Sequence, residues 1–185
     1  MDDIWPVVTI ITVLFGASEA YVSALCDQST ANWERLDDYE YKVFCLDSYI
    51  SFSSAEQTCN QHDAHLVSIH SMRENDFVHD LIGLRLDRLI YSWIGLYRDY
   101  VGDDWKWTDG SEVDYLNWGY HQPDNYNNIP GFGPENCAQM YIVPRLAWDT
   151  YWNDVKCDIG GHYFVCKRMT DHRPEYVPQK MAKYR

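Results

Sequence analysis

The chain has 185 residues, of which 46% are hydrophobic and 23% are charged. These values are ordinary for a globular protein and exclude a disordered, collagen-like or coiled-coil protein. The length suits one domain with short appendages. The formal net charge of −13 makes nucleic acid a poor partner, because phosphate groups would repel the chain, and it favours cations instead.

Residues 1–20 have the pattern of a secretory signal peptide. The apolar run Ile4–Phe15 has the length of a signal core, and small residues place cleavage after Ala20, with Ala24 as the competing site. A membrane anchor and an N-terminal core strand are the alternative interpretations. No later run is apolar enough to cross a membrane, so we expect a secreted, extracellular protein without a membrane span.

The first half of the remaining chain predicts two strands and two helices. Residues 21–38 are polar and aperiodic, and we interpret them as an N-terminal extension. Alternation in Tyr39–Phe44 is typical of a half-buried strand, and Leu66–Ile69 predicts a short second strand. Two Ser-x-x-Glu sequences predict helix starts at Ser53 and Ser71. The second helix carries an amphipathic stripe of apolar residues: Phe77, Val78, Leu81 and Ile82.

The second half predicts strands and one long loop. The predicted strands are Trp93–Leu96, Ala138–Val143 and Tyr163–Lys167. Trp105–Trp107 alternates in the same manner, and Tyr151–Asp154 follows a turn. Residues 118–136 are rich in Asn, Asp, Gly and Pro, and a loop this long in a compact domain usually has a function. Residues 170–185 form a basic C-terminal tail, which we interpret as a solvated terminus. Early helices and late strands predict an α+β domain over residues 39–169.

The six cysteines are expected to form disulfides if the protein is secreted. Their spacing alone does not choose among the many pairings that six cysteines allow. A structural zinc site is the alternative. It is disfavoured because the sequence contains no Cys-x-x-Cys pair.

The long loop and a later strand offer oxygen ligands in Gln122-Pro123-Asp124, Glu135 and Asn153-Asp154. Calcium takes about six to eight oxygen ligands of these types. A cis bond before Pro123 would turn the flanking side chains to the same side. Taken singly, each short sequence is more often a turn. Their combination and their order carry more weight than any one of them.

In combination, these motifs resemble the C-type lectin domain family over roughly residues 39–168. The matching motifs are Trp93-Ile94-Gly95-Leu96, Asn117-Trp118, Gln122-Pro123-Asp124, Glu135-Asn136-Cys137, Trp152-Asn153-Asp154 and the cysteines Cys59, Cys137, Cys157 and Cys166. The resemblance implies the C-type lectin fold, with two helices, small antiparallel sheets and a long calcium-binding loop, stapled by disulfides.

The resemblance also implies a disulfide pattern. The pairs would be Cys59–Cys166 across the domain and Cys137–Cys157 in the loop half. Cys26 and Cys45 then remain to pair with each other, similar to the N-terminal bridge of the family's long form.

The family's principal calcium site maps onto five residues of this chain, and each carries a usable oxygen: Gln122, Asp124, Glu135, Asn153 and Asp154. In the family, two neighbouring hydroxyls of a sugar ligate the calcium, donate hydrogen bonds to carboxylates and accept them from amides. The resemblance therefore implies a calcium-dependent lectin that is not an enzyme. Its sugar contacts would come from Gln122, Asp124, Glu135 and Asn153.

The order amide-proline-acid in Gln122–Asp124 resembles the family's galactose type, whereas acid-proline-amide is the mannose type. The implied ligands are galactose and N-acetylgalactosamine, bound through the 3- and 4-hydroxyls. Tyr126 stands where galactose-type members often carry a tryptophan that stacks on the sugar. Simple packing in the loop is the alternative for Tyr126. The segment Asn127–Pro134 replaces an expected glycine-rich stretch and alters the loop. Trp105, Trp107 and Trp118 are expected in the core.

An auxiliary calcium site of the family would involve Asp99 and Asp103. Asn125 and Asn136 stand where acids often occur, and fewer carboxylates mean weaker calcium binding. A solvated acidic loop is the favoured interpretation of Asp99 and Asp103.

Two other functions compete with the lectin hypothesis. An acidic C-type lectin-like protein could serve an extracellular matrix or a mineral surface, with sugar binding secondary. A hydrolase using Asp103-Asp104 or Glu135 as acid and base is the weaker alternative. One sugar site binds weakly, so useful avidity would need a homo-oligomer or multivalent glycans.

Overall fold

The computed structural model describes residues 32–83, 90–126, 133–142 and 150–170. The predicted signal peptide at 1–20, most of the extension at 21–38 and nearly all of the tail at 170–185 lie outside these residues. None of the helices in the described part is long and apolar enough to cross a membrane.

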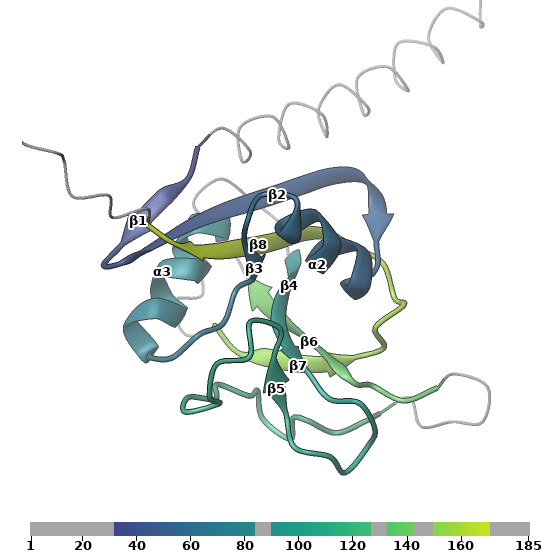
Figure 1. Ribbon diagram of the computed structural model, residues 1–185. Helices are drawn as coiled ribbons and strands as arrows, with labels where there is room; N and C mark the ends of the chain where they lie inside the picture. The colour runs from purple at the N-terminus through teal and green to yellow at the C-terminus, as the bar shows by residue number, and fades with distance from the viewer. Residues whose placement is uncertain (1–31, 84–89, 127–132, 143–149, 171–185) are drawn as a thin grey trace, which may run out of the picture.

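The strands of the described residues join in one sheet with the order β1-β2-β8-β4-β6-β7, to which β3 adds beside β8 and β5 beside β4 (Figure 1). Their bounds are β1 Glu34–Leu36, β2 Tyr39–Ile50, β3 His65–Leu66, β4 Ile90–Tyr97, β5 Lys106–Trp107, β6 Cys137–Ile142, β7 Trp152–Val155 and β8 Gly161–Met169. The sequence predicted small antiparallel sheets. A parallel contact between β4 and β8 joins the antiparallel ribbon β1-β2-β8 to the antiparallel group β4-β6-β7.

The first helix, α2, spans Phe52–Asn60 and begins two residues earlier than a cap at Ser53 would place it. Ser51 caps it by accepting the N–H of Ser54 at 3.3 Å, so the predicted cap at Ser53 is wrong. The reason is tertiary: Phe52 is buried with its ring edge-on to Trp93, which places it inside the helix.

Glu56, the other half of that predicted capping box, is used elsewhere. Its carboxylate accepts the N–H of Leu66 at 2.8 Å and contacts His65 Nδ1 at 2.6 Å. It therefore holds β3 against α2 instead of capping the helix.

The second helix, α3, spans Met72–Gly83, and its predicted start is confirmed. Ser71 accepts the N–H of Glu74 at 3.1 Å. On the predicted apolar stripe, Val78 and Ile82 are buried, and the other two residues pack partly against the core. The helix therefore covers the sheet with the face that the sequence periodicity indicated.

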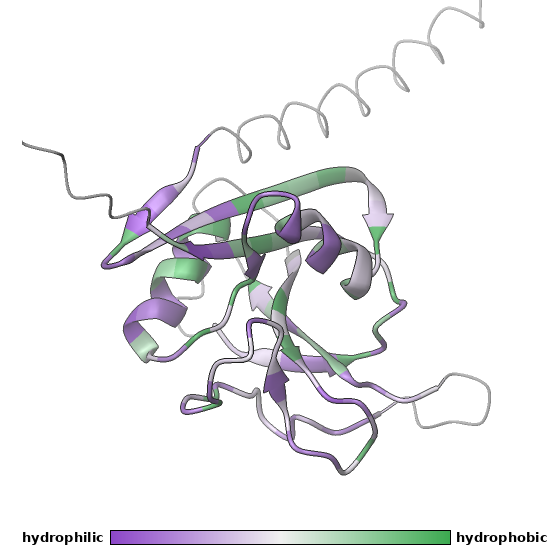
Figure 2. Cartoon of the chain, viewed as in Figure 1, coloured by the Kyte–Doolittle hydropathy of each residue, from purple (hydrophilic) through white to green (hydrophobic). Residues whose placement is uncertain are grey.

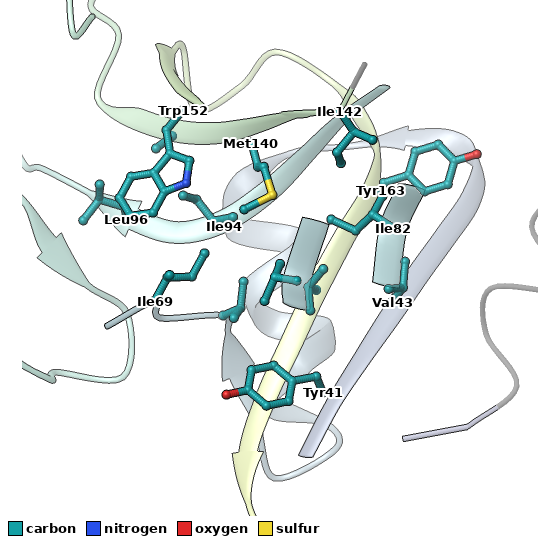
Figure 3. Packing of buried hydrophobic residues seen from close by; sticks show 14 of the residues in the cluster. Tyr41, Val43, Ile69, Ile82, Ile94, Leu96, Met140, Ile142, Trp152 and Tyr163 are labelled. Atoms are coloured by element: carbon teal, nitrogen blue, oxygen red, sulfur yellow. The ribbon is translucent and has the colours of Figure 1, made fainter. Parts of the chain in front are cut away.

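The core lies between the helices and the sheet. Figure 3 shows Ile94, Leu96, Met140 and Trp152 meeting in the larger cluster, which extends to Tyr41 at the other end. Trp107 is buried, and Trp105 and Trp118 pack partly against this cluster, so the predicted placement of these rings is confirmed. Figure 2 shows hydrophobic residues along the central strands and mostly hydrophilic ones in the long loops.

The glycine of the Trp93–Leu96 motif has a steric reason. A Cβ atom on Gly95 would lie 2.6 Å from the carbonyl oxygen of Leu66, which is too close for any side chain. Gly95 also donates its N–H to the carbonyl of Val67 at 2.8 Å. The glycine therefore lets β4 approach the segment after α2.

Two disulfides join distant parts of the fold and confirm the pairs that the resemblance implied. Cys59 of α2 bonds to Cys166 of β8, and Cys137 of β6 bonds to Cys157 after β7. Cys45 is also disulfide-bonded. Its predicted partner, Cys26, lies outside the described residues, so this third pair stays a prediction.

Candidate functional site

Three carboxylates from separate parts of the chain meet beside β7. Asp124, Glu135 and Asp154 each offer a carboxylate oxygen, and these oxygens lie within 4.8 Å of one another. Asp124 is exposed, whereas Glu135 and Asp154 are buried. Calcium–oxygen distances are about 2.3–2.6 Å, so oxygens on opposite sides of one ion lie about 4.6–5.2 Å apart. The spacing of the cluster therefore fits a single calcium ion.

The pairing of β6 with β7 creates this cluster. The register places Ala138 opposite Asp154, so Glu135, which lies two residues before β6, comes close to Asp154. The Cys137–Cys157 disulfide links the same two segments, with an S–S distance of 2.00 Å. A sheet and a covalent bond thus fix the positions of the two buried acids.

Asp154 is fully buried, and its two oxygens accept the main-chain N–H groups of Asp124 at 2.9 Å and Asn125 at 3.0 Å. Burial raises the pKa of Asp154, and the charge of Asp124 raises it further, although the two N–H groups act in the opposite direction. A raised pKa shows that the carboxylate charge is costly in this environment. A bound cation would relieve that cost.

Glu135 and the 122–126 loop hold each other in place. The N–H of Glu135 donates to Asn125 Oδ1 at 2.8 Å. The N–H of Tyr126 lies 2.9 Å from Glu135 Oε2 and 3.0 Å from Asp124 Oδ1, so these two carboxylates share one donor. The loop is therefore folded around the carboxylates, with Asn125 in a left-handed conformation at φ 48°.

The predicted ligand set also includes two amides. Gln122 precedes Pro123 through a cis peptide bond. Its side-chain oxygen is buried and has no hydrogen-bond partner within the described part of the chain. Asn153 donates its side-chain N–H to the carbonyl of Asp154 at 2.8 Å, so its side-chain oxygen is the atom it can offer to a ligand. Buried polar atoms normally have partners, and an unpartnered amide oxygen in this loop fits an oxygen-binding cation.

Arg98 is a residue of this site that the sequence analysis missed. Its guanidinium lies 3.7 Å from Asp154 Oδ2 and donates to the carbonyl of Glu135 at 2.9 Å. The available signal was a single basic residue between a buried strand and an acidic segment. Nothing in that local pattern shows that the side chain turns inward, because the contacts are with residues 37 and 56 positions later.

The two predicted auxiliary ligands are not part of the cluster. Asp99 pairs with Lys106, and Asp103 accepts the N–H of Tyr100 at 3.2 Å. Both side chains are therefore used inside their own loop. This agrees with the favoured interpretation of a solvated acidic loop.

A serine, a histidine and an aspartate come together outside the cluster. His70 lies 2.7 Å from Asp114 through Nδ1 and 3.2 Å from Ser111 through Nε2. The hydroxyl of Ser111, however, donates to Asp109 at 2.5 Å. A hydroxyl has one proton, so His70 is not placed to accept it, as a nucleophilic serine would require.

The sequence profile of the Lectin C-type domain matches residues 48–168. The chain belongs to the C-type lectin domain family. C-type lectin lectoxin-Lio1 from Erythrolamprus poecilogyrus is 33% identical over 142 residues, which cover 76% of this chain and 80% of that protein.

Solved structures of C-type lectin folds superpose on the chain. The C-type lectin CEL-I from Cucumaria echinata matches with a TM-score of 0.62 and 29% identity, over 76% of this chain and 96% of the other. A calcium-independent type II antifreeze protein matches with a TM-score of 0.58 and 27% identity, over 75% and 92%. Domains of this family are typically binding modules rather than enzymes, which weakens the hydrolase alternative.

Within this C-type lectin domain, the ring of Tyr126 is available to a ligand. The residue is 76% exposed, so its ring is not buried in the loop. Its main-chain N–H, as described above, is bound to both Asp124 and Glu135. The residue that carries this exposed ring is thus anchored to the carboxylate cluster through its main chain.

Proposed function

We propose that this protein is a secreted, calcium-dependent lectin that binds terminal galactose or N-acetylgalactosamine. The observation that carries the proposal is the cluster of Asp124, Glu135 and Asp154, whose oxygens lie within 4.8 Å of one another. The amides of Gln122 and Asn153 supply the remaining protein ligands. Calcium bound there would offer open coordination positions to two neighbouring hydroxyls of one sugar ring.

The protein's own groups would recognise those hydroxyls by hydrogen bonding. Each carboxylate accepts the proton of a sugar hydroxyl, and each amide donates an N–H to a hydroxyl oxygen. Gln122 and Asp124 stand on either side of Pro123 and thus present a donor and an acceptor in a fixed order. We assign the 3- and 4-hydroxyls of galactose to this order, following the family's amide-proline-acid type.

The exposed ring of Tyr126 supports galactose in particular. Galactose has one apolar face, which an aromatic ring can cover. Tyr126 follows Asp124 by two residues, and its ring is 76% exposed. We therefore assign Tyr126 to stacking on the bound sugar.

The fold alone does not assign calcium binding, because a calcium-independent antifreeze protein shares it. The proposal rests instead on the donor set and on the unpartnered oxygen of Gln122. Because the donor set and the unpartnered Gln122 oxygen suit a calcium site, we prefer a lectin to a matrix or mineral-associated protein. The secretory segment at 1–20 and cleavage after Ala20 are part of the proposal.

The proposal is tested by passing the full chain over immobilised galactose with calcium. We expect retention, elution by a chelator, and elution by free galactose or N-acetylgalactosamine but not by mannose. Failure to bind galactose, lactose or N-acetylgalactosamine in the presence of calcium would contradict it.

The specificity motif is tested separately. Exchanging the pair, Gln122→Glu with Asp124→Asn, should weaken galactose relative to mannose, measured by inhibition with the two monosaccharides. Calcium titration of the double variant is the control, because the ligand set keeps its composition. An unchanged preference would show that the motif does not select the sugar.

A further inference from the structure

We infer that Arg98 is a positioning residue, which holds the calcium ligands in place. Its guanidinium is a permanent positive charge beside a site that takes one calcium ion. This inference rests on the proposed function, because it concerns the same site. It goes beyond the ligand set, since Arg98 itself cannot bind a metal.

The guanidinium of Arg98 joins three parts of the site. Its Nε donates to Asn136 Oδ1 at 3.1 Å, and one terminal nitrogen donates to the carbonyl of Glu135 at 2.9 Å. The same terminal nitrogen lies 3.7 Å from Asp154 Oδ2. The main-chain N–H of Arg98 adds a bond to the carbonyl of Asn136 at 2.9 Å. The backbone that carries the Glu135 ligand is thus held by the residue that directly follows β4.

The surroundings of Arg98 favour arginine over lysine at this position. The residue is only 9% exposed, and its guanidinium lies 4.7 Å from the ring centre of Trp105. Arginine stacks on aromatic rings and donates through a rigid planar fork, which lysine cannot imitate. A buried cation also needs nearby negative charge, and the three-carboxylate cluster supplies it.

The acid next to Arg98 is already paired with another residue, which favours a single metal ion at this site. Asn136 donates to the carbonyl of Asp99 at 3.3 Å, while the side chain of Asp99 pairs with Lys106. The segment after β4 is therefore tied to the 135–136 segment through Arg98 and Asn136. A second calcium on this side would meet the Arg98 charge without the three carboxylates that offset it at the first site.

The experiment compares Arg98→Lys and Arg98→Gln with the wild-type full chain by calcium titration calorimetry, without sugar. We expect one calcium per wild-type chain and calcium affinity lower by about tenfold or more in both variants, as for other residues that orient metal ligands. Melting with and without calcium is the second readout. The stabilisation by calcium should shrink in both variants.

Arg168→Gln is a matched control. Arg168 also stacks on a ring, with its guanidinium 4.0 Å from the centre of Trp33, pairs with Glu40 at 2.9 Å and donates to the carbonyl of His62 at 3.2 Å. Its loss should lower the melting temperature but leave calcium affinity unchanged. Equal calcium affinity in wild type and all three variants would show a purely structural role for Arg98 and would overturn the inference.

Other results separate the remaining explanations. If calcium affinity is unchanged in Arg98→Lys and higher in Arg98→Gln, only the charge of Arg98 affects calcium binding. This result would overturn the positioning role. Two calcium ions per wild-type chain would overturn the single-ion part. No calcium binding by the wild type would instead sink the proposed function. If the Arg98 variants do not fold, Asn136→Ala removes the acceptor of Arg98 Nε, and an unchanged calcium affinity there would overturn the inference.

Discussion

Two groups of charged residues in this domain differ in their charge balance. Between α3 and β8, Lys167 donates to Glu74 at 2.6 Å, and the hydroxyl of Tyr41 donates to the same carboxylate at 2.6 Å. In the loop site, three carboxylates gather near one guanidinium that is 3.7 Å from Asp154. The first group is neutralised by its own residues, whereas the second keeps an excess of negative charge.

The balanced group suits a structural role in the fold, whereas the unbalanced group suits the binding of a cation. Glu74 also accepts the N–H of His70 at 2.8 Å, and Lys167 donates to the carbonyl of Ser68 at 3.0 Å. A buried ion pair with satisfied hydrogen bonds fixes one arrangement of helix and sheet. A buried acid with a raised pKa, such as Asp154, is instead stabilised when a cation arrives.

The largest expected effect comes from breaking the balanced group. Lys167→Met leaves the Glu74 charge buried without its partner and should lower the free energy of unfolding by about 3–5 kcal/mol. Urea denaturation measures it. Adding Glu74→Gln should recover much of the loss, because the unpaired charge is then removed. A loss below 1 kcal/mol in the single variant would contradict the role given to this pair.

The unbalanced group should respond to calcium. At a free calcium concentration of about 100 times the Kd, the wild-type domain should gain about 2.7 kcal/mol of stability over the chelated form. Asp154→Asn should abolish this gain, measured by denaturation with calcium and with chelator. Lys167→Met is the contrasting variant, since it should lose stability and keep the calcium gain. Retention of the gain in Asp154→Asn would remove Asp154 from the ligand set.

A smaller effect is expected at the rim of the loop site. Tyr126→Ala should lower galactose affinity by about 0.5–1.5 kcal/mol, the typical contribution of an aromatic contact. Calcium affinity should stay the same, because Tyr126 uses its main-chain N–H toward the carboxylates. Tyr126→Phe serves as the control and should keep most of the affinity. Galactose binding that survives Tyr126→Ala unchanged would exclude stacking.

The smallest effect concerns pH near the balanced group. Burial alone would raise the pKa of Asp109, but hydrogen bonds from Ser111 and Ser68 and the charge of Lys167 lower it below its ordinary value. A lowered folded-state pKa contributes stability above the unfolded-state pKa, and this contribution is lost as pH falls through the folded-state value. Asp109→Asn should therefore be less stable than wild type at neutral pH, with a difference that shrinks in acid. Denaturation of both proteins in chelator across acid pH measures it, and a constant difference would contradict the assignment.

The sequence predicted the parts of the fold that depend on short-range patterns. Ser71 caps α3 as its Ser-x-x-Glu sequence indicated, and most strands overlap segments with a strand-like pattern. The strand β1 was missed, because it lies in the segment interpreted as an extension. The same logic failed at Ser53, where an identical spacing is not the cap. The burial of Phe52 against Trp93 decided that start, and these two residues are far apart in sequence.

In the candidate site too, residue types could be predicted from the sequence, whereas long-range contacts could not. The residue types of Gln122, Asp124, Glu135, Asn153 and Asp154 indicated an oxygen-binding cation before any coordinate was known. The sequence analysis did not predict a role for Arg98. Asp99, a predicted auxiliary ligand, pairs with Lys106 instead. The sign of a residue's charge can be read locally, but its partner cannot.

The motifs that carry the family resemblance could be read from the sequence, because side-chain chemistry and short spacings are properties of the chain. The disulfides and the calcium ligands were implied by that resemblance. Which charges are neutralised depends on the tertiary structure. Glu74 meets Lys167 across 93 residues of chain, and Asp154 becomes fully buried when β7 pairs with β6. Electrostatic free energies depend on distance and on exposure to water, and folding sets both.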